Sequence, residues 1–144
     1  MTGHVEGMEI QKRRVAILKE TEELVRRRWL QNDMAQDKQG NSVSPRYHEA
    51  CAWCLHGAVV TATAKVFGDD DIDALYREVR LVVGAVVQYG LGEILPSGWV
   101  NDQRVDMLLE TWNDEPCRTS DEVLRALAQT ADHIESMVPA CLHN

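Results

Sequence analysis

Residues 48–67 constrain the fold most, because this segment is apolar on nearly every side of a helical projection. A helix at a protein surface shows one apolar stripe, whereas a helix that is apolar all round has to be buried. Small side chains recur along the segment and would let neighbouring helices approach closely. We therefore expect a central helix from His48 to Phe67, ended by Gly68, with the rest of the chain packed around it.

The other helices follow from apolar residues that repeat with the helical period of about 3.6 residues. They are predicted over residues 9–30, 70–89, around 105–112 and 119–138. Aspartates at the start of the 70–89 segment and a capping box of Thr119 and Glu122 mark two helix starts. Pro139 is predicted to end the last helix.

A polar segment, residues 31–45, separates the first two predicted helices. Gly40 and Asn41 lie near its tip and Pro45 closes it, so we expect a short β-hairpin or an ordered loop. Residues 1–8 are predicted to be a flexible tail. The fold predicted for residues 1–144 is therefore a single all-α domain, a compact bundle of about five helices.

Charge and composition limit the classes of function. The 144-residue chain carries a net charge of −8, which repels nucleic-acid phosphates and anionic lipid. Lys12, Lys19 and Arg26 recur along the first helix, but glutamates alternate with them, which is typical of a solvated face. Direct nucleic-acid binding is therefore not expected. Without a secretion signal or an apolar run of ~20 residues, we expect a cytoplasmic protein with no membrane span and with reduced cysteines.

The stretch HEACAWCLHGAVV, residues 48–60, contains the ligand types of a metal site. On a helix His48, Cys51 and Cys54 would form one ridge, whereas His56 would point elsewhere. Structural zinc sites usually take paired cysteines from a turn, and cysteine is common in protein cores. We therefore expect core packing and no metal or other cofactor. Zinc in the purified protein would instead make that ridge the ligand set, with Cys117 as the first candidate for a fourth ligand.

A cysteine nucleophile is the enzymatic alternative. Cys54 would attack, with His48 or His56 as its base. Asn113 or Asp114 would orient that base. A position inside a buried helix does not lower a thiol pKa, so catalysis is not the expected function.

The segment WNDEPCRT, residues 112–119, has the composition of a structural corner. Asn113 or Asp114 would stabilise the turn through side-chain hydrogen bonds to the backbone. Arg118 would pair with Asp114 or with Asp37 and so join two loops. As a ligand or partner site, the same junction would comprise Trp29, Asp37, Trp112, Asn113, Asp114 and Arg118.

The order of RRRWLQND, AQDKQG, WCLHGAVVTA and WNDEPCRTSDEVLRAL over residues 15–134 resembles a family of small helical proteins of unknown function from bacteria, notably actinobacteria, and their phages. The matching residues are Trp29, Asp37, Gly40, Cys54, Gly57, Ala58, Trp112, Asn113, Asp114, Arg118 and Thr119. Asn32 and Cys117 stand where the family pattern leads us to expect glycine. The resemblance implies the helical fold and no reaction.

Exclusion leaves macromolecular binding as the expected function. We expect a non-enzymatic accessory protein that binds another protein, encoded by a phage or mobile element and modulating a host complex, for example as a defence inhibitor. The alternative is a small cysteine-dependent enzyme or ligand-binding protein that uses Cys54 and the junction from Trp112 to Asp114. Self-association through Trp99 or the 70–89 helix stays open, because sequence does not separate inner from interfacial apolar faces.

Overall fold

Helices make up most of the chain in the computed structural model, which describes residues 2–99 and 102–138. The elements are α1 (Thr2–Arg28), β1 (Ala35–Gln36), β2 (Ala52–Trp53), α2 (Leu55–Phe67), α3 (Ile72–Ala85), the π-helical turn η1 (Val86–Gly90), α4 (Gln103–Asn113) and α5 (Ser120–Ser136). The predicted fold, five helices with a short hairpin between the first two, is confirmed for the described residues.

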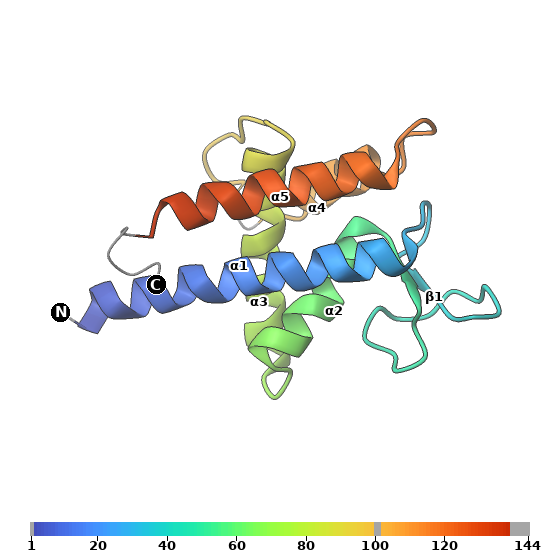
Figure 1. Ribbon diagram of the computed structural model, residues 1–144, viewed down its shortest axis with the longest axis horizontal. Helices are drawn as coiled ribbons and strands as arrows, with labels where there is room; N and C mark the ends of the chain where they lie inside the picture. Colours follow the sequence, from blue (N-terminus) through green and yellow to red (C-terminus); the bar gives the residue numbers. More distant parts are fainter. Residues whose placement is uncertain (1, 100–101, 139–144) are drawn as a thin grey trace.

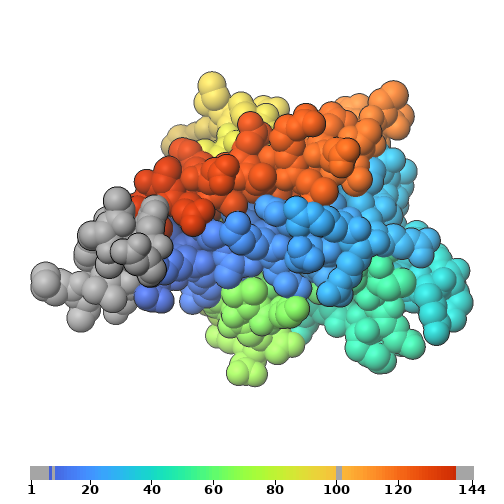
Figure 2. All heavy atoms as spheres, viewed as in Figure 1, coloured from blue at the N-terminus to red at the C-terminus, as the bar shows by residue number. Residues whose placement is uncertain are grey.

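The two long helices α1 and α5 lie side by side and run in opposite directions (Figure 1). In Figure 2 the two helices lie against each other along one face of the molecule, and the loops around the hairpin protrude beyond the C-terminal end of α1. Behind them α3 runs across the bundle and continues into η1 (Figure 1). One cluster of buried side chains contains residues from all five α-helices. The core therefore lies between the α1–α5 pair and the helices behind it.

The central helix α2 is shorter than the sequence predicts. It begins at Leu55, and residues 48–54 form a turn and strand β2, so the predicted helix is wrong for these residues. Backbone pairing with the preceding loop explains the difference. The Cys51 amide donates to the Gln36 carbonyl at 2.9 Å, and the Cys54 amide donates to the Met34 carbonyl at 3.1 Å. Gly68 ends α2 as predicted, with a positive φ of 99°.

The hairpin is held by an antiparallel pair in which Ala35 faces Trp53 and Gln36 faces Ala52. Its connection contains a tighter loop, because Gln36 also forms a bridge with Ser42. At the tip, the Asp37 carboxylate accepts hydrogen bonds from the backbone amides of Gln39 and Asn41. Such a side-chain-to-backbone turn explains why this polar segment is ordered.

The start of α2 touches the same loop through Gly57. A Cβ atom at this position would overlap the backbone carbonyl of Met34. Only glycine therefore lets the first turn of α2 approach the loop this closely. This contact positions the side chains of the first turn of α2, including His56.

Two helix ends differ from prediction. α1 begins at Thr2, so its first turns run through the segment for which the sequence predicts a tail. α3 begins after its cap Asp71, and its regular α-helix ends at Ala85, where the chain widens into η1. Single π-helical turns of this kind are local irregularities that apolar periodicity does not detect.

The predicted capping box of α5 is present. The Thr119 hydroxyl accepts from the Glu122 amide at 3.3 Å, and the Glu122 carboxylate accepts from the Thr119 amide at 3.0 Å. Pro139, predicted to end this helix, lies outside the described residues. None of the helices in the described part of the chain has the length and apolar character needed to cross a membrane.

Candidate functional site

The predicted ridge of His48, Cys51 and Cys54 is wrong, because these residues do not share a helix. His48 lies in a turn, where its ring packs edge-on against Tyr47 at 4.7 Å between ring centres. Cys51 is engaged in the hairpin, and Cys54 caps α2. Within residues 2–99 and 102–138, no three His, Cys, Asp or Glu side chains come together as a metal site requires.

Cys54 is a buried helix cap. Its side chain is only 4% exposed, and its sulfur accepts a hydrogen bond from the Gly57 amide at 3.3 Å. Met34 Sδ lies 3.8 Å from Cys54 Sγ. Burial raises the pKa of the thiol to about 11, and this effect outweighs the lowering effect of the hydrogen bonds from the Gly57 and His56 amides. At neutral pH the sulfur is therefore a protonated thiol, which is a poor nucleophile.

The residues proposed as partners of Cys54 are engaged elsewhere. His56 Nδ1 lies 3.0 Å from a carboxylate oxygen of Glu110 on α4. Asn113 is 1% exposed and belongs to a different network. The structure therefore does not bring together the nucleophile, base and orienting residue of the enzymatic alternative around Cys54.

Asn113 joins three parts of the chain. Its Oδ1 accepts hydrogen bonds from Trp29 Nε1 at 2.7 Å and from the Leu55 amide at 3.0 Å. Its Nδ2 donates to the Leu30 carbonyl at 3.2 Å and to the Asp114 carboxylate at 2.9 Å. Because two partners can only donate and the other two only accept, the orientation of the amide is determined by its surroundings.

Asp114 and its neighbours connect the same corner to the end of α1. The Asp114 carboxylate accepts from the Asn32 amide at 2.8 Å. Asn32 has a positive φ of 65°, which asparagine tolerates better than most residues. Gln31 donates to the carbonyls of Asn113 and Glu115 at 3.0 and 2.6 Å. The corner is therefore a structural joint, as the first of the two sequence interpretations predicts.

Arg118 does not make the predicted pair with Asp114 or Asp37. Its Nε donates to the Trp112 carbonyl at 2.9 Å, and its Nη1 donates to Glu122 at 3.0 Å. Its guanidinium also lies 3.9 Å from the centre of the Trp112 ring. Cation–π stacking and a salt bridge one helical turn away keep Arg118 within its own corner.

Two adjoining hollows form a groove along the exposed side of α4, which we call the α4 groove. Their volumes are about 420 and 460 Å³, and both are lined by Met107, Thr111 and Glu115. The remaining lining residues are Glu93, Trp99, Arg104, Leu108, Glu110, Trp112, Asp114 and Pro116. Two residues of the predicted junction, Trp112 and Asp114, line the groove. The other four, Trp29, Asp37, Asn113 and Arg118, are not among its lining residues.

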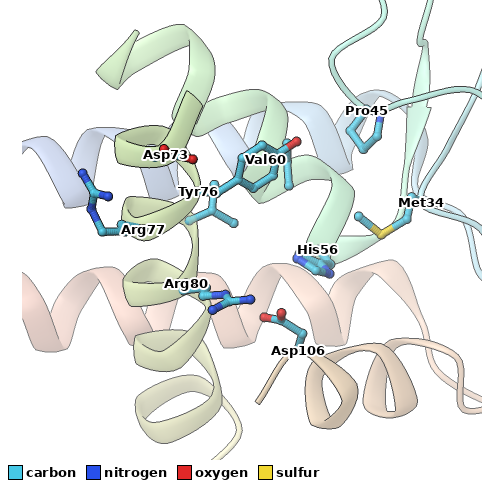
Figure 3. A pocket seen from close by; sticks show the side chains of 10 residues that line it. Met34, Pro45, His56, Val60, Asp73, Tyr76, Arg77, Arg80 and Asp106 are labelled. Atoms are coloured by element: carbon cyan, nitrogen blue, oxygen red, sulfur yellow. The ribbon is translucent and has the colours of Figure 1, made fainter. Parts of the chain in front are cut away.

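A second cavity of about 480 Å³ lies between α2, α3 and α4 (Figure 3). We call it the three-helix cavity. Figure 3 shows His56 of α2, Arg80 of α3 and Asp106 of α4 close together at one end. Burial raises the pKa of Asp106, while the nearby charges of His56 and Arg80 act in the opposite direction.

The sequence predicts little of this cavity. His56 is a sequence candidate only as a base for Cys54 or as a residue of the cysteine–histidine stretch, and Arg80 and Asp106 lie on helices far apart in the sequence. A signal does exist in α3, where Asp73, Tyr76 and Arg80 fall on one helical face and all line the cavity.

A family model described as "Family of unknown function (DUF6197)" matches residues 10–133. No curated protein and no solved structure matches the chain.

Proposed function

Because the chain belongs to this family of unknown function, DUF6197, we propose its role from its own surface: a non-enzymatic accessory protein that binds another protein through the α4 groove. The observation that supports this proposal is the combination, in one groove, of exposed apolar side chains with an excess of carboxylates.

The apolar part of the groove offers contact area for a partner. Met107, which lines both hollows, is 60% exposed. Ile94 does not line the groove, but it follows the lining residue Glu93 in the chain and is 95% exposed. Trp99 and Trp112 supply aromatic surface on the groove wall. Aromatic residues and methionine are enriched at protein interfaces, because they bury much area and adapt to a partner's shape.

The charged part of the groove defines the kind of partner. Its described lining includes the carboxylates of Glu93, Glu110, Asp114 and Glu115 and a single cation, Arg104. Arg104 is itself paired with Asp102 at 2.7 Å. A basic surface with apolar residues between its lysines and arginines complements such a groove.

The partner that we propose is therefore a nucleic-acid-binding protein, since such proteins carry basic surfaces. An acidic chain with a net charge of −8 would occupy that surface in place of nucleic acid. A phage- or mobile-element-encoded modulator of a cytoplasmic host complex, for example a defence inhibitor, would act in this way.

Selection from a displayed random-peptide library tests the proposal. We expect the enriched peptides to combine Lys or Arg with aromatic or aliphatic residues and to bind the folded chain. Met107→Glu should abolish this binding, because it adds a charge to the apolar part of the groove. Ile72→Glu is the matched control, since Ile72 is also an exposed apolar residue, 44% exposed, but lies on α3 away from the groove.

Enriched peptides without basic residues would contradict the proposed partner. Equal binding to both variants would contradict the proposed groove. A nucleic-acid-binding protein that releases its nucleic acid when the wild-type chain is added, but not when Met107→Glu is added, would support the proposed mode of action.

A further inference from the structure

The solvent side of α3 carries a row of exposed side chains, which we call the α3 face. It consists of Ile72, Asp73, Tyr76, Arg77 and Arg80, which follow one another at the helical spacing of three and four residues. Ile72 and Tyr76 are 44 and 41% exposed. A surface helix usually turns only polar side chains to solvent, so this face keeps apolar area that no other part of the described chain covers.

The charged residues of the α3 face are separated along the helix. Asp73 lies in the first turn, and Arg77 and Arg80 follow one and two turns later. Arg80 already interacts within the chain. Asp73 and Arg77 are four residues apart, yet within residues 2–99 and 102–138 neither side chain forms an ion pair or a hydrogen bond. The face therefore offers a carboxylate and a guanidinium, both unpaired, about 6 Å apart along the helix axis.

An antiparallel copy of α3 complements these charges. When a twofold axis relates two antiparallel helices, the same side of each helix meets the other. With the axis level with Leu75, Asp73 of one copy lies opposite Arg77 of the other, and symmetry repeats this pair. The two Tyr76 side chains then start about 3 Å apart along the helix axes, within reach of ring contact. A parallel pair would instead bring like charges together.

We propose that the α3 face binds a second copy of this chain and forms an antiparallel, twofold-symmetric dimer. Charge complementarity selects this occupant, because the same helix provides an arginine for Asp73 and a carboxylate for Arg77 at matching spacing. Figure 3 shows Tyr76 and Arg77 extending to opposite sides of α3, so an aromatic contact and a charged contact lie side by side. No residue of this face lines the α4 groove, so the dimer does not depend on the role proposed for that groove.

Sedimentation velocity of the full chain over a range of concentrations, in about 0.15 M salt, tests the dimer. At this ionic strength the net charge of −8 is screened beyond about 8 Å. We expect a reversible equilibrium between monomer and dimer. Asp73→Arg and Arg77→Asp should each raise the dissociation constant of the dimer about tenfold or more, because like charges then meet twice. Combining the two substitutions restores opposite charges and should return the constant close to its wild-type value.

Asp132→Arg and Arg125→Asp are matched controls, since they make the same changes of charge at exposed positions of α5. Both should leave the dimer unchanged. Met107→Glu in the α4 groove should also leave it unchanged, whereas Ile72→Glu should weaken the dimer and keep peptide binding to the groove. Circular dichroism spectra equal to that of wild type would show that each variant is folded.

A folded chain that stays monomeric at every concentration would overturn the proposal, and the α3 face would then be open to a different partner. A dimer that tolerates Asp73→Arg and Arg77→Asp would overturn it too, because the contact would lie elsewhere. Failure of the combined variant to recover the dimer would show that the two side chains do not pair across the twofold axis.

Discussion

At the scale of single residues, Asn113 is the side chain on which most of the joint depends. Replacing it with Ala removes the hydrogen bonds to Trp29, Leu30, Leu55 and Asp114 and leaves two buried N–H groups without an acceptor. We expect Asn113→Ala to lower the free energy of unfolding by about 3 kcal/mol. Urea denaturation followed by circular dichroism measures this loss.

Gln129→Ala is the control for Asn113→Ala. Gln129 is exposed on α5, so its replacement should change stability by less than about 0.5 kcal/mol. A loss at Asn113 no larger than this would mean that the network contributes nothing to stability.

Because its thiol is buried, Cys54 should make the free energy of unfolding depend on pH in the alkaline range. Burial raises its pKa from 9.0 to about 11, so the unfolded chain loses the thiol proton first as the pH rises. Stability from this group is therefore complete below about pH 9 and falls through the range up to about pH 11, by about 3 kcal/mol in all. Cys54→Ser keeps a capping oxygen and lacks this titration.

Because tyrosine and lysine titrate in the same range, the quantity to measure is the difference in unfolding free energy between wild type and Cys54→Ser. We expect this difference to stay constant from neutral pH to about pH 9 and to shift against the wild type above it. A difference that is constant up to about pH 11 would show that the folded chain accommodates the thiolate.

For single residues, the sequence predicts that residues 112–119 form a structural corner, but it does not predict which side chains pair there. Trp112, Asn113 and Thr119 have the structural roles expected of a turn and a helix cap. Arg118 could not be assigned in the same way, because several carboxylates were within its reach in sequence. Its actual partners, the Trp112 ring and Glu122, result from the geometry of one tight corner.

At the scale of secondary-structure elements, the first turn of α2 depends on its close approach to the Met34 loop. In Gly57→Ala the new methyl group would overlap the Met34 carbonyl, and the helix would have to move. We expect a loss of about 2 kcal/mol in the free energy of unfolding. Calorimetry of the melting transition measures it.

Gly7→Ala is the comparison for Gly57→Ala, because the added methyl group meets nothing within 4 Å. Alanine has the higher helix propensity, so this variant should be as stable as wild type or up to about 1 kcal/mol more stable. Equal effects of the two replacements would contradict the packing argument.

Helix α2 shows where apolar periodicity stops predicting secondary structure. This periodicity predicts α3 and α5 well, because each of these helices has one clear apolar stripe. It fails for residues 48–54, since a short buried strand and a buried helix are equally apolar and carry no periodic signal that separates them. Backbone pairing with residues 34–36 decides between the two, and this pairing is long-range information.

At the scale of the whole molecule, neither recess could be predicted from the sequence. The three-helix cavity combines residues from α2, α3 and α4, and the α4 groove combines α4 with the loop before it. Each side chain is unremarkable within its own helix. Only the packing of the helices brings His56 to Arg80 and Asp106, so the sequence predicts the fold better than it predicts the surface.

The overall charge leads to the last prediction, the salt dependence of partner binding. Opposite charges at a surface are screened over about 10 Å at 0.1 M salt and about 3 Å at 1 M. A basic peptide selected for the α4 groove should therefore bind about tenfold more weakly at the higher salt concentration, and the apolar contact with Met107 should account for the binding that remains.

Replacing Glu93 and Glu115 with Gln should weaken binding at low salt and flatten the salt dependence, because both carboxylates line the groove. Titration calorimetry of the peptide at both salt concentrations, with wild type and with the double variant, measures this dependence. A peptide affinity that is independent of salt would show that the carboxylates do not select the partner, and the α4 groove would then be an apolar contact surface alone.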